Sequence, residues 1–409
     1  MKYETRLIWV LGITFGFVFF DRNAVNYLMP FIVSDLKFNN QQVGMIASAL
    51  SFTWALAGFL GGAYSDRSGN RKTLLLSTVI AFSLCSFLSG LATSFLTLLL
   101  ARLLMGLAEG PILPVSQSLV ALESSGARRG HNMGVMQNFG SNLLGSFLAP
   151  LVLVALASLY SWRAAFFIAG LPGLVMALLI ARYVHAPVRP ASQAMAAASA
   201  VDGGMRYSEM LRYRNIWLCM LMSIVMVAWM VLGWAFLPLF YVRIRQLTAG
   251  QMSLLMSVLG LSAAFFSFVV PGLSDRFGRR PVIVAFNLIG LLAPLAALYF
   301  DGSLYALAAL IFIGWSASGT FPLFMGTIPS ETIPARYVAT SLGLVMGLGE
   351  ILGGVSGPWA AGWAADRYGL RAPIMIEAGC AILGALLALF LRETAPARLA
   401  RHTVAVAAT

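Results

Sequence analysis

Charged residues are scarce in this sequence. Asp, Glu, Lys and Arg make up 10% of the 409 residues, and hydrophobic residues make up 59%. Soluble domains contain about 25% charged residues, so most of this chain is not expected to face water. The sequence also lacks a phosphate-binding loop, a dinucleotide-binding fingerprint, a zinc-ligand spacing and a nucleophile motif. We therefore expect neither an enzyme nor a protein with a cofactor or metal.

Cysteine is also rare. Cys85, Cys219 and Cys380 all fall in apolar stretches without metal-ligand spacing, and we expect them to be small core residues rather than disulfides. No Asn-X-Ser/Thr acceptor is present and the breaks between apolar stretches are short, which favours a bacterial inner membrane. A removable signal peptide is not expected, because the first apolar stretch contains Asp21 and Arg22.

Apolar stretches long enough to cross a bilayer recur along the whole chain. A bilayer core about 30 Å thick needs about 20 apolar residues per helical crossing. The sequence therefore predicts an all-α membrane protein with twelve transmembrane helices. We expect these helices at 7–32, 43–64, 73–91, 95–120, 131–157, 164–183, 216–242, 248–273, 281–300, 305–328, 337–364 and 372–391.

The positive charge of the chain lies between the predicted helices. The net charge is +12, which in a soluble protein would suggest nucleic acid, but most of the 27 Lys and Arg residues occur in alternate breaks. That distribution is typical of topology signals that keep basic loops in the cytoplasm. We expect both termini in the cytoplasm, with the lipid bilayer rather than nucleic acid as the partner.

The second half of the chain repeats the first. A shift of 208 residues aligns identical residues at several positions, and Asp66-Arg67 aligns with Asp275-Arg276 at a shift of 209. Parallel repeats with a binding site between them, near the middle of the membrane, are typical of carriers in which one half moves against the other. The pairs at 208 are Gly106 and Gly314, Pro114 and Pro322, Glu123 and Glu331, Arg128 and Arg336, Gly145 and Gly353, Pro150 and Pro358, and Arg163 and Arg371.

The longest polar break separates the two copies. It spans 184–215 and contains a run rich in Ala, Ser and Gly, which indicates a flexible cytoplasmic linker. We expect an N-terminal six-helix bundle at 1–183, a pseudo-symmetric C-terminal bundle at 216–391 and a cytoplasmic tail at 392–409. We expect the protein to be a monomer.

The loop between the second and third predicted helices carries a recognisable motif. Its Gly62, Asp66-Arg67, Gly69 and Arg71 resemble the signature of the major facilitator superfamily, and the likeness extends over nearly the whole chain. In the second copy Asp275-Arg276 is kept, while Pro271 stands at the position of Gly62. The resemblance implies the twelve-helix major facilitator fold, and a gating latch made by these residues. The alternative is that they are topology signals alone.

Within that superfamily the chain resembles the anion:cation symporter family. The likeness rests on Asp21-Arg22-Asn23 in the first helix, on Arg102 to Gly110 in the fourth, and on Gly357-Pro358 at the end of the Gly-rich eleventh. The resemblance implies proton-coupled carriage of small organic anions such as sugar acids.

Five ionisable residues lie near the middle of predicted helices: Asp21, Arg22, Arg102, Glu109 and Glu350. Each costs at least about 2.5–3.5 kcal/mol to insert there, so such residues usually have a function. A guanidinium grips a carboxylate with two hydrogen bonds, and we expect Arg22 and Arg102 to bind an anionic substrate. We expect Asp21 and Glu109 to carry protons. Fixed ion pairs between helices are the alternative.

Glu350 departs from the family pattern, in which Asn usually occupies this position and Asn142 is the equivalent in the first half. Three roles remain open for it: a second proton carrier, a contact for a hydroxylated substrate, or a partner for an arginine. Glu377, nearer a helix end, is given no role.

Neutral polar and aromatic residues complete the predicted site. Asn26, Tyr27, Gln137, Asn138 and Asn142 could bind hydroxyl groups of a substrate. Trp234 and Trp315 could stack on a sugar face or an aromatic ring, although such side chains often only pack.

Together these features predict a proton-coupled symporter for a small organic anion, either a hydroxylated carboxylate such as a sugar acid or an aromatic carboxylate. A proton-driven drug or metabolite antiporter of the same fold is the first alternative. A transporter-like sensor that does not move its ligand is the second.

Overall fold

The computed structural model describes residues 3–68, 70–124, 129–185, 210, 212–334 and 338–395. Within these ranges every regular element is a helix, which confirms the predicted all-α class. In the first half the elements are α1 (Tyr3–Leu36), α2 (Asn40–Ser68), α3 (Arg71–Gly90), α4 (Phe95–Glu109), α5 (Ile112–Glu123), α6 (Arg129–Gly134), η1 (Val135–Phe139), η2 (Ser141–Leu148), α7 (Ala149–Leu159) and α8 (Trp162–Tyr183).

The described residues of the second half also form only helices as regular elements. Its elements are α11 (Arg214–Arg243), α12 (Ala249–Phe277), α13 (Arg279–Ile289), α14 (Leu292–Tyr299), α15 (Leu304–Gly314), η3 (Trp315–Thr320), η4 (Leu323–Thr327), α16 (Ile328–Thr332), α17 (Val338–Leu348), η6 (Gly349–Ser356), α18 (Gly357–Tyr368) and α19 (Arg371–Leu389).

Eleven helical segments of the described residues are long and apolar enough to cross a membrane. The remaining segment predicted from the sequence, 337–364, is occupied by α17, η6 and α18, which follow one another without a break from Val338 to Tyr368. The prediction of an integral membrane protein built from membrane-spanning helices is confirmed.

The helices group into two compact units. The first contains Met1–Gly203 and Tyr241–Gly260, and the second contains Gly204–Phe240 and Leu261–Thr409. The predicted linker lies almost entirely outside the described residues, as does most of the predicted tail, so the domain boundaries proposed above remain predictions.

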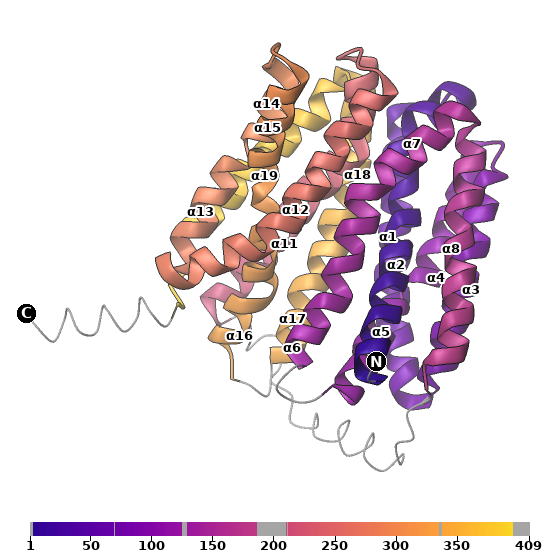
Figure 1. The fold of residues 1–409 in the computed structure, drawn as a ribbon. Helices are drawn as coiled ribbons and strands as arrows, with labels where there is room; N and C mark the ends of the chain where they lie inside the picture. Colours follow the sequence, from indigo (N-terminus) through magenta and orange to yellow (C-terminus); the bar gives the residue numbers. More distant parts are fainter. Residues whose placement is uncertain are drawn as a thin grey trace, which may run out of the picture. The chain divides into compact units, whose positions relative to one another are not determined.

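The first unit is built around α1. In Figure 1 this helix, in indigo, runs through the unit, and it packs against α8, η2 and α7, while α3 lies along α8 and α2 along α4. Large apolar side chains point inward, among them Leu11, Phe15, Val79 and Phe82, each no more than 2% exposed. Others, such as Leu178, point outward. Outward apolar side chains are expected where a helix faces lipid.

Two π-helices repeat in the two halves. Residues 141–148 form η2 and residues 349–356 form η6, which are separated by the 208-residue shift of the sequence repeat. A π-helix is rare, and it changes the backbone hydrogen bonding of its turn. In η2 the carbonyl oxygen of Gly145 accepts hydrogen bonds from Asn23 Nδ2 at 3.1 Å and from Tyr27 Oη at 3.3 Å, both on α1. The structural repeat therefore extends to an irregular element.

Helices α2 and α4 approach each other at Gly106 of α4 and at Gly110, the residue that follows its end. A Cβ atom on Gly110 would lie 2.6 Å from the carbonyl oxygen of Trp54 and 2.7 Å from the backbone nitrogen of Gly58, both on α2. A Cβ atom on Gly106 would lie 2.6 Å from the carbonyl oxygen of Leu50. Because these neighbours are backbone atoms, α2 can sit this close to α4 only where α4 has no side chain.

We expect Gly110→Ala to destabilise the protein by about 1–3 kcal/mol, because the added methyl group forces α2 away from α4. The measurement is the midpoint of thermal unfolding in detergent. Gly134→Ala is the matched control, because nothing lies within 4 Å of a Cβ atom at that helical position. That control should keep or slightly raise the midpoint, since Ala favours helix. Equal midpoints for the two variants would contradict the close approach.

Candidate functional site

The structure places the charged residues of the first half in one region of the first unit. We call Asp21 and Arg22 of α1 and Arg102 and Glu109 of α4 the charged cluster. Asp21 and Arg102 are 0% exposed and Glu109 is 1% exposed, while Arg22 is partly buried. Electrostatic interactions connect Arg102 with Asp21 and Glu109, and Arg22 with Glu109. Three fully buried ionisable groups in a membrane protein make this region a candidate functional site.

Asp21 lies at the start of a short chain of polar groups. The hydroxyl oxygen of Ser86, on α3, lies 2.7 Å from Asp21 Oδ1 and 2.9 Å from the carbonyl oxygen of Phe166, on α8. A hydroxyl has a single hydrogen, so Ser86 can donate to one of these two oxygens at a time. Both contacts become hydrogen bonds when Asp21 is protonated and donates to Ser86. The local geometry therefore suits the neutral form of Asp21.

Arg102 is held at one end of its guanidinium. Its Nη2 donates to the hydroxyl of Ser89, on α3, at 2.5 Å, and its Cζ lies 5.1 Å from the ring centroid of Phe166. Nε and Nη1 are buried and have no hydrogen-bond partner among the described residues. A buried donor without a partner is costly, and more so when it is charged. Two nitrogen atoms of Arg102, which carry three N–H donors, thus lack a partner among the described residues.

The carboxyl group of Glu109 has fewer hydrogen-bond partners among the described residues than the guanidinium of Arg102. Both of its carboxyl oxygens are buried and neither has a hydrogen-bond partner among the described residues. An ionised carboxylate in such a site is strongly disfavoured unless a cation or donor reaches it, and otherwise the group takes up a proton. The arginine that acts most strongly on it is Arg22, through its charge rather than through a direct bond. The charges of Arg22 and Glu109 are therefore coupled.

Arg22 is positioned by aromatic rings rather than by acids. Its Cζ lies 4.7 Å from the ring centroid of Trp54, on α2, and 5.5 Å from that of Phe19, one turn earlier on α1. Cation–π contacts hold a guanidinium by its face and leave its edge donors available. Trp54 is brought here by the close approach of α2 to Gly106 and Gly110. In the part of the chain that the structure describes, Arg22 forms no ion pair.

Some of the neutral polar residues predicted to bind substrate form hydrogen bonds within the first unit, and others are partly exposed. Tyr27 is fully buried and donates to the Gly145 carbonyl. Gln137 accepts a hydrogen bond from Gln117 at 3.1 Å. Asn26 and Asn142 are partly exposed, and the side chain of Asn138 lies outside the described residues. The substrate contacts predicted for these residues remain predictions.

The predicted aromatic residues of the second unit form one cluster. Trp315 is fully buried, and its ring stacks on that of Trp229 with centroids 4.3 Å apart. Trp234 meets Trp315 edge to face at 5.7 Å. Glu350 is partly exposed in the first turn of η6, at the position equivalent to Asn142 in η2. None of the three roles open to Glu350 is decided by this placement.

The first copy of the predicted gating motif is described in part. Gly62 lies in α2 in ordinary contact with Pro114 of α5, at 3.6 Å from a Cβ atom on the glycine. Arg71 opens α3 and donates through Nε to Ser118, also on α5, at 2.5 Å. Asp66 and Arg67 belong to α2, but their side chains and the whole of Gly69 lie outside the described residues. The motif therefore connects α2 and α3 with α5.

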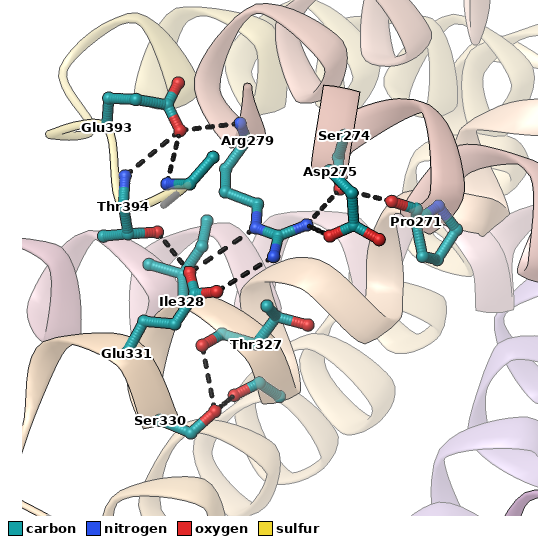
Figure 2. A network of polar contacts seen from close by, with 12 residues as sticks. Pro271, Ser274, Asp275, Arg279, Thr327, Ile328, Ser330, Glu331, Glu393 and Thr394 are labelled. Atoms are coloured by element: carbon teal, nitrogen blue, oxygen red, sulfur yellow. Dashed lines mark hydrogen bonds and ion pairs between the residues drawn. The ribbon is translucent and has the colours of Figure 1, made fainter. Parts of the chain in front are cut away.

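The second copy is part of an extended polar network at one end of the second unit (Figure 2). Arg279 donates to Asp275 at 2.5 Å and, through two nitrogens, to Glu331 of α16 at 2.9 and 3.4 Å. Glu393 accepts from the backbone nitrogen of Arg279 at 2.8 Å, so the segment after α19 caps the start of α13. Arg276 is exposed and forms no hydrogen bond or ion pair with the described residues of this network. The network joins α12, α13, α16 and the segment after α19.

Three residues around Asp21 and Arg102 were not predicted from the sequence. Ser86 of α3 contacts Asp21, and Ser89 of α3 contacts Arg102. The Phe166 ring lies against Arg102, and its carbonyl oxygen lies 2.9 Å from the Ser86 hydroxyl. A signal was present for the serines, because Ser83, Ser86 and Ser89 recur every three residues in an apolar helix and so lie on one face. No pattern in the sequence distinguishes Phe166 from other apolar residues of α8.

Comparison with known proteins agrees with this architecture. A model of the Major Facilitator Superfamily matches residues 11–346 and 224–407. The chain is 35% identical to the hexuronate transporter of Bacillus subtilis (strain 168) over 167 residues, or 41% of this chain and 39% of that protein. It is 28% identical to the 3-(3-hydroxy-phenyl)propionate transporter of Escherichia coli (strain K12) over 375 residues, covering 88% of this chain and 87% of that protein.

The fold also matches a solved transporter. The crystal structure of a D-xylose-proton symporter superimposes with a TM-score of 0.78 at 16% identity, covering 97% of this chain and 99% of the other. The major facilitator fold predicted from the sequence is confirmed. The chain belongs to the Major Facilitator Superfamily of membrane transporters.

Proposed function

We propose that this protein is a secondary active transporter that carries a small organic anion together with protons, by alternating access. The observation that carries the proposal is the charged cluster. Among the described residues it combines a guanidinium at Arg22 that is held by its face with a buried carboxyl group at Glu109 that has no hydrogen-bond partner. One group is suited to bind a carboxylate and the other to bind a proton.

The substrate carboxylate binds the edge of the Arg22 guanidinium, where two parallel hydrogen bonds match its two oxygens. Once the positive charge of Arg22 is neutralised, it no longer favours the ionised form of Glu109, and burial then favours the protonated form. Anion and proton therefore bind with positive coupling, which we expect to be about 1–3 kcal/mol.

Asp21 is the second proton carrier in this proposal. The hydrogen-bond chain through Ser86 to Phe166 is complete when Asp21 is neutral, and Arg102 supplies the positive charge that stabilises its ionised form when the proton leaves. Arg102 thus controls the acid, and in addition offers Nε and Nη1 to a substrate oxygen.

The rings around Arg22 support a substrate with a flat or hydroxylated body. Trp54 and Phe19 flank the guanidinium, so a carboxylate held there brings its body against aromatic surface. The two relatives named above, by their names, carry a hexuronate and a hydroxylated aromatic carboxylate. We infer that the substrate is either a sugar acid or an aromatic carboxylate.

Uptake into proteoliposomes separates these two classes and tests the coupling. We expect radiolabelled hexuronate or hydroxyphenylpropionate to accumulate when the outside is acidic, and not to accumulate without a proton gradient. Uptake of D-xylose, which has no carboxylate to bind Arg22, is the control and should stay at the level of empty liposomes. Accumulation of either anion that is indifferent to the gradient would contradict proton coupling.

We further propose that the protein lies in a bacterial inner membrane as a monomer with both termini in the cytoplasm. The basic breaks between helices support this orientation. Cysteine labelling of an added C-terminal residue in intact and permeabilised cells tests it.

A further inference from the structure

A buried carboxyl group in the second unit has no role in the proposed function. Glu377 lies two turns into α19 and is 0% exposed. Both of its carboxyl oxygens are buried, and neither has a hydrogen-bond partner among the described residues. Such a group requires a physical explanation, because native proteins contain very few.

The surroundings of Glu377 are tightly packed. A Cβ atom on Gly233, in α11, would lie 3.2 Å from Glu377 Oε1 and would overlap the ring of Trp315, in η3. The carboxyl group and the indole therefore meet at the glycine. Trp315 in turn stacks on Trp229 of α11, which is 0% exposed. Three elements thus enclose the carboxyl group in apolar and aromatic surface.

No cation balances Glu377 in the described residues. It forms no ion pair there, and the one titratable group with which it interacts is Cys380, one turn further along α19. The groups that meet it from α11 and η3, Gly233 and Trp315, do not titrate. The elements α13, α14 and α18 also pack against α19. Their charged side chains lie at the helix ends, at Arg279, Arg280, Asp366 and Arg367.

An ionised Glu377 is therefore excluded from this arrangement on energetic grounds. Transfer of an unpaired carboxylate into a dry site costs several kcal/mol, and the group takes up a proton instead. A permanently neutral acid is still poorly explained, because an apolar side chain of similar size would pack there without an unsatisfied hydroxyl. A buried carboxyl group of this kind points to a site that is protonated in this conformation and loses its proton in another.

The neighbouring element is suited to such a change. Trp315 opens η3, a 3₁₀ helix that follows α15 within a predicted membrane span, and a stretch of this kind often marks a hinge. The hydroxyls of Ser316 and Ser318 in η3 and the indole nitrogen of Trp229 are also buried, and they too have no hydrogen-bond partner in the part of the chain that the structure describes. Water that entered this region on a shift of η3 would find polar groups to bind and could accept the proton of Glu377.

We propose that Glu377 is a further proton-binding site of the carrier, lying within the second unit and separate from the charged cluster of the first. This inference rests on the proposed proton-coupled function. It assigns one transported proton to α19 in addition to those carried by Asp21 and Glu109.

The test compares the wild-type protein with Glu377→Gln, which keeps the shape of the protonated acid but cannot exchange a proton. Purified proteins are reconstituted, and the number of protons moved per substrate is obtained from the membrane potential at which net flux reverses. We expect the ratio to fall by one in Glu377→Gln. Asp366→Asn, which removes an exposed carboxylate of the same unit, should leave the ratio unchanged.

Infrared spectroscopy of the same proteins provides a reading that does not depend on transport. We expect a carbonyl band of a protonated carboxylic acid in the wild type, and its loss in Glu377→Gln but not in Asp366→Asn. An unchanged proton ratio, or a spectrum in which Glu377→Gln removes no protonated band, would overturn the inference. If the wild-type protein moves no protons, the proposed function is wrong, and Glu377 then carries no transported proton either. In that case the infrared band still shows whether Glu377 is protonated.

Discussion

Arg22→Ala is expected to weaken substrate binding by about 2–5 kcal/mol, because it removes the partner of a buried carboxylate. That range corresponds to a dissociation constant at least about 30-fold higher. Arg22→Lys keeps the charge but loses the planar fork, and we expect it to restore only part of the affinity. Binding is measured by thermal shift or calorimetry with the anion that the uptake assay identifies.

Arg182→Ala is the matched control for this prediction. Arg182 also lies over an aromatic ring, that of Tyr183 at 5.8 Å, but it is exposed at the end of α8. Its removal should leave binding unchanged. If the Arg22→Ala variant binds the anion with wild-type affinity, the substrate carboxylate is held elsewhere. The remaining N–H donors of Arg102 are then the first group to test.

Glu109→Gln is expected to separate exchange from accumulation. The amide resembles the protonated acid, so the variant should bind the anion and exchange it across the membrane with equal substrate on both sides. Its gradient-driven accumulation of the anion should fall well below that of the wild type, because position 109 no longer releases a proton and only the other proposed proton carriers remain. Counterflow and gradient-driven uptake in the same proteoliposomes measure the two activities.

The contrast between these two assays makes the Glu109 prediction specific. A variant that merely fails to fold would lose both activities, whereas loss of one proton site lowers accumulation and leaves exchange intact. Glu123→Gln, at the end of α5, is the control carboxyl group and should keep both. Wild-type accumulation by Glu109→Gln would exclude Glu109 as a proton carrier and leave Asp21 as the remaining candidate in the first unit.

The residues of the charged cluster were largely predictable from the sequence, because charged residues are rare within membrane-spanning helices. Asp21, Arg22, Arg102 and Glu109 each interrupt an apolar helix, and the seven-residue spacing of Arg102 and Glu109 puts both on one face of α4, about 10 Å apart. The sequence could not indicate that Arg22 would contact rings while Arg102 contacts serines. That difference depends on which helices lie beside α1 and α4.

Glu377 illustrates the opposite case. In a soluble protein the buried face of a helix is recognised by alternation with polar residues. In a membrane helix such as α19 the outward face is also apolar, since it meets lipid, so the pattern does not reveal which residues are enclosed. From the sequence, Glu377 lies near a helix end and no role is predicted for it. In the structure it is fully buried against α11 and η3.

The sequence by itself determined the all-helical class, the number of predicted spans and the twofold repeat. The bilayer thickness fixes the length of each apolar stretch, and the exclusion of charged residues from the bilayer core places most of them between these stretches. The tertiary structure alone decided the π-helices η2 and η6, the approach of α2 to Gly110 and the partners of each buried charge. These features arise from contacts between helices far apart in the sequence. Uniformly apolar helices carry no pattern that specifies such contacts.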